Sequence, residues 1–276
     1  MPRINLELEP SHMDKSLLKT IAQRTIEIEA KSIAEMTTFI NDDFINAVEL
    51  IGKTTGRLIV SGIGKSAIVA QKIVATLNST GTASIFMHAA DAIHGDLGMI
   101  QPNDIVLVIS KSGDSSEIKV LVPLINNFGN ILIGMVGNLE SFLALNSTLV
   151  LNTTVQQEAC PNNLAPTSST TAQMVMGDAL AVCLMEWKSF NPSDFAKYHP
   201  GGALGKKLYL RVSDLIASKQ KPYVATTASI KEVIVEKIVE IEKLVEIIKE
   251  VPVEKIVEVI KEITNNEEIE KLMKEN

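Results

Sequence analysis

The chain has 276 residues, of which 46% are hydrophobic, and its formal net charge is −7. This length and hydrophobic content allow one large core, with residues left over for a smaller second unit. The acidic balance argues against a nucleic-acid partner, because such a partner usually requires a basic surface that displaces phosphate counterions. The only two cysteines, Cys160 and Cys183, are too few for a disulfide framework or a thiolate metal cage, as expected in the reducing cytoplasm.

The N-terminal residues do not predict export, and no segment predicts a membrane span. Acids interrupt the only apolar stretch of the first ten residues, unlike in a signal peptide. No run reaches the roughly 20 apolar residues that cross a bilayer. Ser11-His12-Met13 resembles a cloning scar, so residues 1–13 are interpreted as a leader or tag-like segment, with Met13 as the natural start. We therefore expect a soluble, cytoplasmic protein without a membrane partner.

Alternating helical and strand patterns begin at residue 16. Apolar residues recur at helical spacing over 16–51, without an internal proline or glycine. Short apolar runs then predict strands at 57–62, 84–87, 104–110, 130–136 and 148–151. Further helices are expected at 66–77, from Glu117 onward, and at 169–187. Repeated strand–helix units of this kind predict an α/β fold, a three-layer sandwich with about five parallel strands.

The C-terminal part of the chain has a different composition. From residue 230 it consists almost entirely of Ile, Val, Leu, Glu and Lys, and VEKIVE occurs at 235–240 and again at 253–258. This 18-residue offset corresponds to about five helical turns, so both copies would present the same helical face. Pro252 is expected to divide the tract into two amphipathic helices, and Asn266 to cap a third. The sequence therefore predicts a helical C-terminal appendage.

Two loops that follow predicted strands have the pattern of an anion site. Gly62-Ile63-Gly64-Lys65-Ser66 joins a strand to a helix, so its backbone amides, the helix N-terminus and a hydroxyl can face an anion. It is not a Walker loop, which has four residues between its outer glycines. The loop 110–116 has four serine hydroxyls ahead of a helix, which suits a phosphate held by neutral donors. An ordinary tight turn and a solvated loop are the alternatives.

Three further segments contain candidate catalytic or ligand groups. His88 and His94 are six residues apart, which is not the helical spacing of a zinc site, so we favour a structural or substrate-contacting role over metal binding. Glu158 precedes the polar run 166–171, and a carboxylate beside a buried segment is a candidate base. A solvated loop glutamate is the alternative. His199 lies in a glycine-rich turn and would otherwise be a surface histidine.

Six blocks of the sequence resemble the arabinose 5-phosphate isomerases of the SIS (sugar isomerase) superfamily in order and spacing. They are GIGKS, HGDLGM, SKSGDSSE, EACPNNLAPTSSTT, MGDALA and HPGGALGKKL, and the match spans roughly residues 17–214. The resemblance implies an SIS domain at 14–210, a homotetramer and no cofactor. It also implies interconversion of D-arabinose 5-phosphate and D-ribulose 5-phosphate, an aldose–ketose isomerisation that supplies the KDO and lipopolysaccharide pathway.

The resemblance also assigns site residues. The residues similar to the phosphate ligands of the family are Gly64, Ser66, Ser110, Ser112 and Ser115. His94, Ser169 and Thr170 are expected elsewhere in the substrate pocket, with no metal site. The isomerisation needs a base, a means of ring opening and a group that stabilises the enediolate. We assign Glu158 as the base, His199 to ring opening and proton shuttling, Lys65 to electrostatic stabilisation and Glu117 to orientation.

The C-terminal part departs from the family pattern. Relatives usually have two CBS modules after the isomerase domain, and the first residues of 211–276 resemble the start of one. That resemblance ends near Val235, so we expect a CBS-like start that runs into a low-complexity helical tail. Two other functions remain open: a non-catalytic SIS sugar-phosphate sensor, and an isomerase for another sugar phosphate. A sensor could dispense with Glu158 and His199.

Overall fold

The computed structural model describes residues 14–201. The tag-like segment 1–13 and residues 202–276, which include the CBS-like start and the expected tail helices, lie outside the described residues. The chain divides into two compact units, Met1–Leu210 and Arg211–Asn276, and every described residue belongs to the first. Within the described part, no helix is both long and apolar enough to span a membrane.

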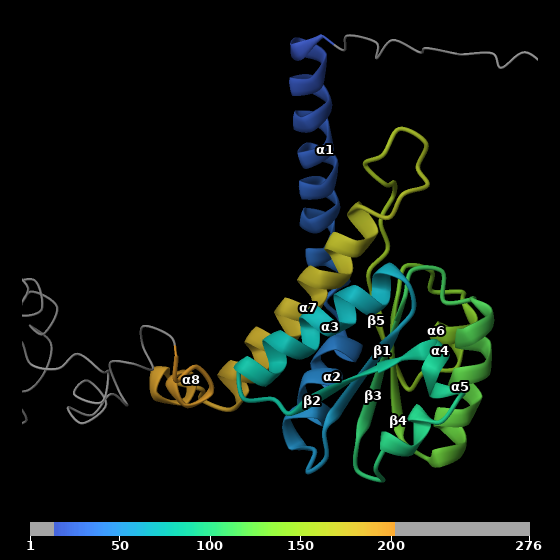
Figure 1. Cartoon of the computed structure of the whole chain (residues 1–276), viewed down its shortest axis with the longest axis vertical. Helices are drawn as coiled ribbons and strands as arrows, with labels where there is room; N and C mark the ends of the chain where they lie inside the picture. Colours follow the sequence, from blue (N-terminus) through green and yellow to red (C-terminus); the bar gives the residue numbers. More distant parts are fainter. Residues whose placement is uncertain (1–13, 202–276) are drawn as a thin grey trace, which may run out of the picture. The chain divides into compact units, whose positions relative to one another are not determined.

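Five parallel strands form one sheet in the order β2-β1-β3-β4-β5 (Figure 1). The strands are β1 Leu58–Gly62, β2 Ser84–His88, β3 Ile105–Ser110, β4 Ile131–Val136 and β5 Leu149–Asn152. Every residue of β1 and β3 is buried. Strands buried on both faces have near-continuous apolar sequences rather than alternating ones, which is why short apolar runs predicted them. The predicted sheet of about five parallel strands is confirmed.

Helices cover both faces of this sheet and complete the predicted three layers. They are α1 Lys15–Glu35, α2 Asp42–Lys53, α3 Lys65–Ser79, α4 Ala89–Ala92, α5 Ser116–Phe128, α6 Phe142–Leu145, α7 Ser168–Trp187 and α8 Pro192–Tyr198, with 3-10 turns η1 Met36–Phe39 and η2 Asp96–Met99. One core lies between the sheet and α2, α3 and α7, and a second lies between the sheet and α4, α5 and α6. Figure 1 shows the two groups of helices on opposite sides of the strands.

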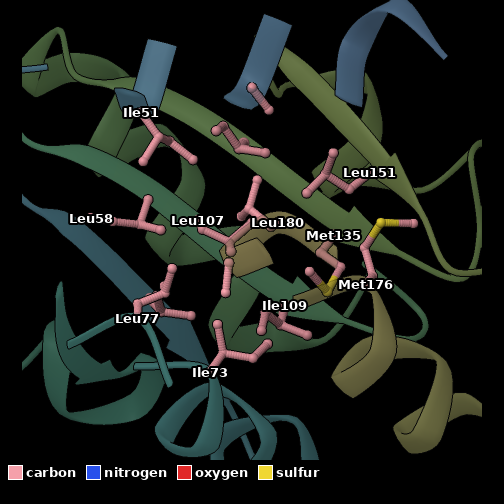
Figure 2. Close-up of a cluster of buried hydrophobic side chains, with 14 of the residues drawn as sticks. Ile51, Leu58, Ile73, Leu77, Leu107, Ile109, Met135, Leu151, Met176 and Leu180 are labelled. Carbon is pink, nitrogen blue, oxygen red and sulfur yellow. The ribbon is translucent and has the colours of Figure 1, made fainter. Parts of the chain in front are cut away.

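The first of these cores fixes α3 and α7 against the middle of the sheet. In Figure 2, side chains of α2, α3 and α7 meet side chains from β1, β3, β4 and β5. Those labelled are Ile51, Leu58, Ile73, Leu77, Leu107, Ile109, Met135, Leu151, Met176 and Leu180. All ten are almost completely buried. Each such side chain contributes about 1.5 to 3 kcal/mol relative to an exposed one, so the helix positions are strongly determined.

Residues 16–51 are mainly helical, as predicted, but the helical structure is interrupted between α1 and α2. The hydroxyls of Thr37 and Thr38 donate to backbone carbonyls three residues earlier, at 2.8 Å each. The Asn41 side chain then accepts from the Phe44 amide at 3.2 Å and caps α2. Such polar side chains satisfy free backbone groups at helix ends. The helix therefore ends without the glycine or proline that usually marks a break.

The strand order reverses between β1 and β3. The chain passes from β1 to β2 on one side, and then continues to β3, β4 and β5 on the other side. In open parallel sheets, the crevice outside the carboxyl ends of the strands at this point is the usual ligand site. Because α3 follows β1 and α5 follows β3, the N-termini of both helices flank this crevice.

Candidate active site

A cavity of about 320 Å³ lies at the carboxyl ends of β1 and β3, the size of a small-molecule pocket. Its lining comes from the start of α3, the β3–α5 loop and the start of α7: Ile63, Lys65, Ser66, Ser110, Lys111, Ser112, Ser115, Pro166, Ser169, Thr170 and Gln173. Seven of the site residues expected from the sequence are therefore brought together in one cavity, although they come from three separate segments. Gly64 lies next to them, as the residue that precedes α3.

Three helix N-termini meet at this cavity. The first turns of α3 and α7 contribute lining residues, and Ser115, which caps α5, is another. Gly64 precedes α3 with φ of 58° and ψ of −127°, and no side chain caps the helix there. L-residues rarely adopt this backbone conformation, so glycine permits the turn. Each helix N-terminus favours a nearby anion by roughly 0.3 to 1 kcal/mol, so the cavity suits a phosphate group.

The serine hydroxyls around the cavity are arranged as donors. The oxygens of Ser110, Ser112 and Ser115 accept backbone N–H groups, at 3.0 Å from Gly113, 3.4 Å from Asp114 and 3.4 Å from Ile118 respectively. Because a hydroxyl has one donor and two acceptor positions, these bonds leave the O–H of Ser110 and of Ser112 for a ligand, whereas the Ser115 hydroxyl bonds to Glu117. The loop therefore provides neutral donors for an anion without a bidentate arginine.

Glu158 lies directly behind the cavity wall and is not a solvated loop residue, because its side chain has no exposed surface. Its Oε1 accepts from Lys111 Nζ at 2.6 Å and from Ser169 Oγ at 2.5 Å. Its Oε2 accepts from the Thr167 and Ser169 amides at 2.8 and 3.1 Å, and from Thr167 Oγ1 at 3.2 Å. Five donors thus surround the carboxylate, and two of them are amides at the start of α7.

These donors determine the protonation state of Glu158. Burial alone would raise the pKa of this carboxyl, but the hydrogen bonds from Lys111, Ser169 and the two backbone amides outweigh it and lower the pKa to about 2. The group is therefore ionised at neutral pH. It is not a free base in this arrangement, because every oxygen position that could receive a proton is occupied by a donor.

The structure adds two cavity residues that the sequence analysis did not single out. Lys111 lines the cavity and forms the ion pair with Glu158. Gln173 is buried in α7 and accepts a hydrogen bond from Ser66 Oγ at 3.2 Å. The position of Lys111, between two serines at the end of a buried strand, could have predicted that it lines the site. No local pattern predicts that Gln173 lines the cavity, because its contact with Ser66 joins residues that are far apart in the chain.

Glu117 and His94 lie outside the cavity lining. Glu117 is in the first turn of α5, where its own backbone amide, Ser115 and Ser116 lower its pKa through hydrogen bonds. His94 is exposed in the loop after β2, at the same edge of the sheet. Among residues 14–201, no group of three or more His, Cys, Asp or Glu side chains is placed to hold a metal ion.

His199 lies far from the cavity within the same chain. It ends α8, where its ring stacks on Phe195 with centroids 3.8 Å apart and its Nδ1 is 2.9 Å from the Phe195 carbonyl oxygen. The preceding residue, Tyr198, lies beside Gly81, just after the end of α3. The cavity is at the start of α3, and a 15-residue helix is about 22 Å long. Figure 1 shows α8 near the far end of α3.

The doubly wound sheet and its serine-lined switch-point cavity define an α/β domain with a cavity that suits an anion, and comparison with protein families identifies the type. The SIS domain model matches residues 52–183, which contain the whole sheet and all the cavity-lining residues named above. Arabinose 5-phosphate isomerase KdsD of Pseudomonas aeruginosa is 52% identical over 195 residues, 71% of this chain and 60% of that protein. KdsD of Escherichia coli K12 is 44% identical over 233 residues, 84% of this chain and 70% of that protein. The chain belongs to the arabinose 5-phosphate isomerase family of SIS-domain proteins.

A solved structure shows the same fold. A protein of Escherichia coli CFT073, in complex with arabinose 5-phosphate, is 37% identical with a TM-score of 0.66, and the match covers 68% of this chain and all of that one. The chain spans about 60% of the length of the first curated relatives that it matches.

Proposed function

We propose that the chain is an aldose–ketose isomerase that interconverts D-arabinose 5-phosphate and D-ribulose 5-phosphate and supplies the KDO and lipopolysaccharide pathway. The main support is a cavity with neutral phosphate donors and a buried carboxylate at its wall. The activity named for the KdsD relatives and the arabinose 5-phosphate bound in the CFT073 structure point to the same substrate. We also propose a cytoplasmic location, which fits the free thiols of Cys160 and Cys183.

In this proposal, the phosphate of the substrate positions the reacting carbons. The serine hydroxyls and the three helix N-termini hold the phosphate, and its binding energy fixes C1 and C2 near Glu158. Lys65 is exposed at the cavity, and its ammonium has no hydrogen bond or ion pair among residues 14–201, so it can face the oxygen on which charge develops. Glu117 would orient the sugar from the start of α5.

The reaction is a pair of proton transfers. In the aldose-to-ketose direction, Glu158 takes the proton from C2, the electrons of that C–H bond form the C1–C2 double bond, and the carbonyl electrons move onto O1. The carboxyl then returns the proton to C1, while O2 loses a proton to become the ketone oxygen and O1 gains one. No oxidant or reductant is needed. His199 would open the sugar ring and move the proton between the oxygens.

The proposal is tested with purified protein and a panel of sugar phosphates: D-arabinose 5-phosphate, D-ribulose 5-phosphate, sedoheptulose 7-phosphate and glucosamine 6-phosphate. We expect interconversion of the two pentose phosphates, followed by NMR. Its rate should be well above the rate at which sedoheptulose 7-phosphate or glucosamine 6-phosphate is converted. Turnover of a different sugar phosphate, without turnover of the pentose phosphates, would show that the proposed substrate is wrong. Binding of these compounds without turnover of any would instead indicate a sugar-phosphate sensor.

We further propose a homo-oligomer, a tetramer, in which His199 completes the cavity of another subunit. The support is the position of His199 at the far end of α3 from Lys65 and Glu158 in its own chain. Glu158→Gln and His199→Ala should each be inactive alone, but refolding them together should restore part of the activity, because some mixed interfaces contain both native residues. Mixed oligomers with no more activity than either parent would contradict the shared site.

The division into an SIS domain at 14–210 and a separate segment at 211–276 is also a proposal. Its support is that the last of the six family-like blocks ends at residue 208, and that the CFT073 protein matches this chain over its own full length. Ending the chain after Ser218 should therefore leave a folded, active isomerase with an unchanged kcat. A truncated protein that is soluble and has the oligomeric state of the full chain, but is inactive, would show that the C-terminal segment takes part in catalysis.

A further inference from the structure

Lys111 and Ser169 are the two cavity-lining residues that bond to Oε1 of Glu158. The proposed base is therefore separated from the cavity only by these two side chains. The role of Lys111 depends on the proposed function, because it concerns how Glu158 becomes able to accept a proton from the substrate.

The donors around Glu158 differ in how firmly they are held. Thr167 and Ser169 belong to the start of α7, and each donates through its backbone amide as well as its hydroxyl. Those positions are set by the helix itself. Lys111 reaches Oε1 from the β3–α5 loop on a flexible four-carbon chain, and 46% of its side chain is exposed. Lys111 is thus the donor that can leave without moving the backbone.

A substrate in the cavity would compete with Glu158 for the ammonium of Lys111. Lys111 lies between Ser110 and Ser112, which are two of the expected phosphate donors. A phosphate monoester has between one and two negative charges near neutral pH, against the single charge of the carboxylate. Both anions are within reach of the same lysine side chain. Binding of the phosphate therefore weakens the ion pair between Lys111 and the Glu158 carboxylate.

Other charged groups near Glu158 do not replace this ion pair. Lys65 lines the same cavity but does not bond to Glu158, and Cys160, two residues further on, accepts the Leu164 and Ala165 amides at 3.1 Å. On the neighbouring helix α1, Glu29 accepts from the Thr171 hydroxyl of α7 at 2.9 Å. Within residues 14–201, Lys111 is the cation that contacts the carboxylate.

We propose that Lys111 is a positioning residue that holds Glu158 inactive in the empty site and transfers its ammonium to the bound sugar phosphate. The transfer removes the donor that occupies Oε1 on the cavity side. The bonds from Thr167 and Ser169 remain and keep the carboxylate oriented toward C2. Isomerase chemistry is thereby coupled to the presence of substrate.

A crystal structure with D-arabinitol 5-phosphate tests this transfer directly, because this alditol phosphate has no carbonyl and cannot react. The 2.6 Å contact between Lys111 Nζ and Glu158 Oε1 should open beyond the ion-pair limit of about 4 Å, with Nζ now bonded to an oxygen of the ligand. The bonds from Thr167 and Ser169 to Glu158 should be retained. An intact Lys111–Glu158 pair in the occupied site would overturn the proposal.

The pH profile of Lys111→Met gives a second, kinetic test. Loss of an adjacent opposite charge raises a carboxyl pKa by about 1 to 3 units, so the free variant should protonate Glu158 at mildly acidic pH. The ratio of kcat/KM for the variant to that of the native protein should fall about threefold to tenfold between pH 7 and pH 4. Ionisation of the free substrate phosphate is the same for both proteins and cancels in this ratio.

The kcat profile and a conservative variant exclude a purely structural role. The acid limb of kcat should be the same in Lys111→Met and the native protein, because Lys111 has already left Glu158 in the complex. Lys111→Arg, which keeps the charge, should restore the native pH dependence of kcat/KM. A constant ratio from pH 7 to pH 4 for Lys111→Met would contradict the proposal.

These results are separable from the proposed function. If the native protein isomerises pentose phosphates while Lys111 stays on Glu158 in the complex, the function stands and the positioning role fails. If Lys111 moves to the bound ligand but no sugar phosphate is converted, the positioning of Lys111 stands and the isomerase function fails.

Discussion

Two buried carboxylates, Glu158 and Asp104, lie at opposite ends of the sheet and have nearly the same surroundings. Asp104 is just before β3, at the amino ends of the strands, and its side chain is 1% exposed. It accepts two backbone amides and forms an ion pair with Arg57 at 2.6 Å, the same distance as between Glu158 and Lys111. Burial and a cationic partner alone therefore do not identify a functional carboxylate.

The difference lies in the cation. The Arg57 guanidinium contacts both oxygens of Asp104, at 3.2 Å from Nε and 2.6 Å from Nη2, and also donates to the Met99 carbonyl. Asn130 closes the network by donating to the carbonyls of Gln101 and Asp104. A planar guanidinium with several fixed partners cannot exchange one for a ligand as a single lysine ammonium can. We infer that the Asp104 network stabilises the fold, whereas the Glu158 pair serves the reaction.

The cavities at the two ends of the sheet also differ in their surroundings. The hollow beside Asp104, at about 430 Å³, is larger than the candidate active site. Its lining includes the last turn of α2 and Gly129, which ends α5. Helix C-termini repel anions, whereas the smaller cavity has three helix N-termini. The direction of the helices, rather than the size of the hollow, therefore indicates which of the two cavities suits an anion.

Glu158→Gln should have the largest effect on activity. An amide cannot accept the proton from C2, so kcat should fall by at least about 10²- to 10⁴-fold, the contribution of a general base. Initial rates of pentose phosphate interconversion measure this, with Asp104→Asn as the matched buried carboxylate. That control should keep kcat within a few-fold at a temperature where it is folded. A Glu158→Gln variant within tenfold of native kcat would remove Glu158 from the chemistry.

Asp104→Asn should have the largest effect on stability. It breaks a buried ion pair and should lower the free energy of unfolding by about 3 kcal/mol at pH 7, measured by urea denaturation. The exposed pair Lys53–Glu49 provides a control, because Glu49→Gln should cost only about 0.5 kcal/mol or less. Similar losses for the two variants would show that the Asp104 network is not a main support of the fold.

The stability difference for Asp104→Asn should also depend on pH. Burial alone would raise the pKa of Asp104, but hydrogen bonds from Arg57 and Gln101 lower it below its ordinary value of 3.8. Because the folded pKa is lower than the unfolded one, the ionised carboxylate stabilises the fold above about pH 3.8, and this contribution is lost as pH falls further. The difference between native and variant should therefore shrink below that pH. A stability difference between native protein and variant that stays constant below pH 3.8 would show that the charge of Asp104 does not cause it.

Ser112→Ala should have the smallest of these effects, on substrate binding alone. Loss of one hydrogen bond to a charged phosphate costs about 1.5 to 3 kcal/mol, so KM should rise about 10- to 100-fold with kcat nearly unchanged. Ser116→Ala is the matched control, since Ser116 is the first residue of α5, directly after the same loop, and does not line the cavity. Equal KM values for both variants would exclude Ser112 from the phosphate site.

Much of the sheet and the serine loops could be predicted from the sequence, because buried parallel strands have apolar runs and their carboxyl ends are loops of polar residues. The break before α2 was missed because Asn41 caps a helix without a glycine or proline nearby. Lys111 was missed because its role depends on Glu158, 47 residues further along the chain. The burial of Glu158 and the distance of His199 from the cavity are likewise set by tertiary packing, which no local pattern reports.

The carboxylate of Glu158, and not the similar one of Asp104, is expected to remove the proton from C2. D-arabinose 5-phosphate labelled with deuterium at C2 tests this most directly, with loss of the label followed by NMR at high enzyme concentration. Native protein and Asp104→Asn should remove the label at the rate of isomerisation, while folded Glu158→Gln should leave it in place. Removal of the C2 deuterium by Glu158→Gln at a rate within tenfold of the native protein would contradict the account.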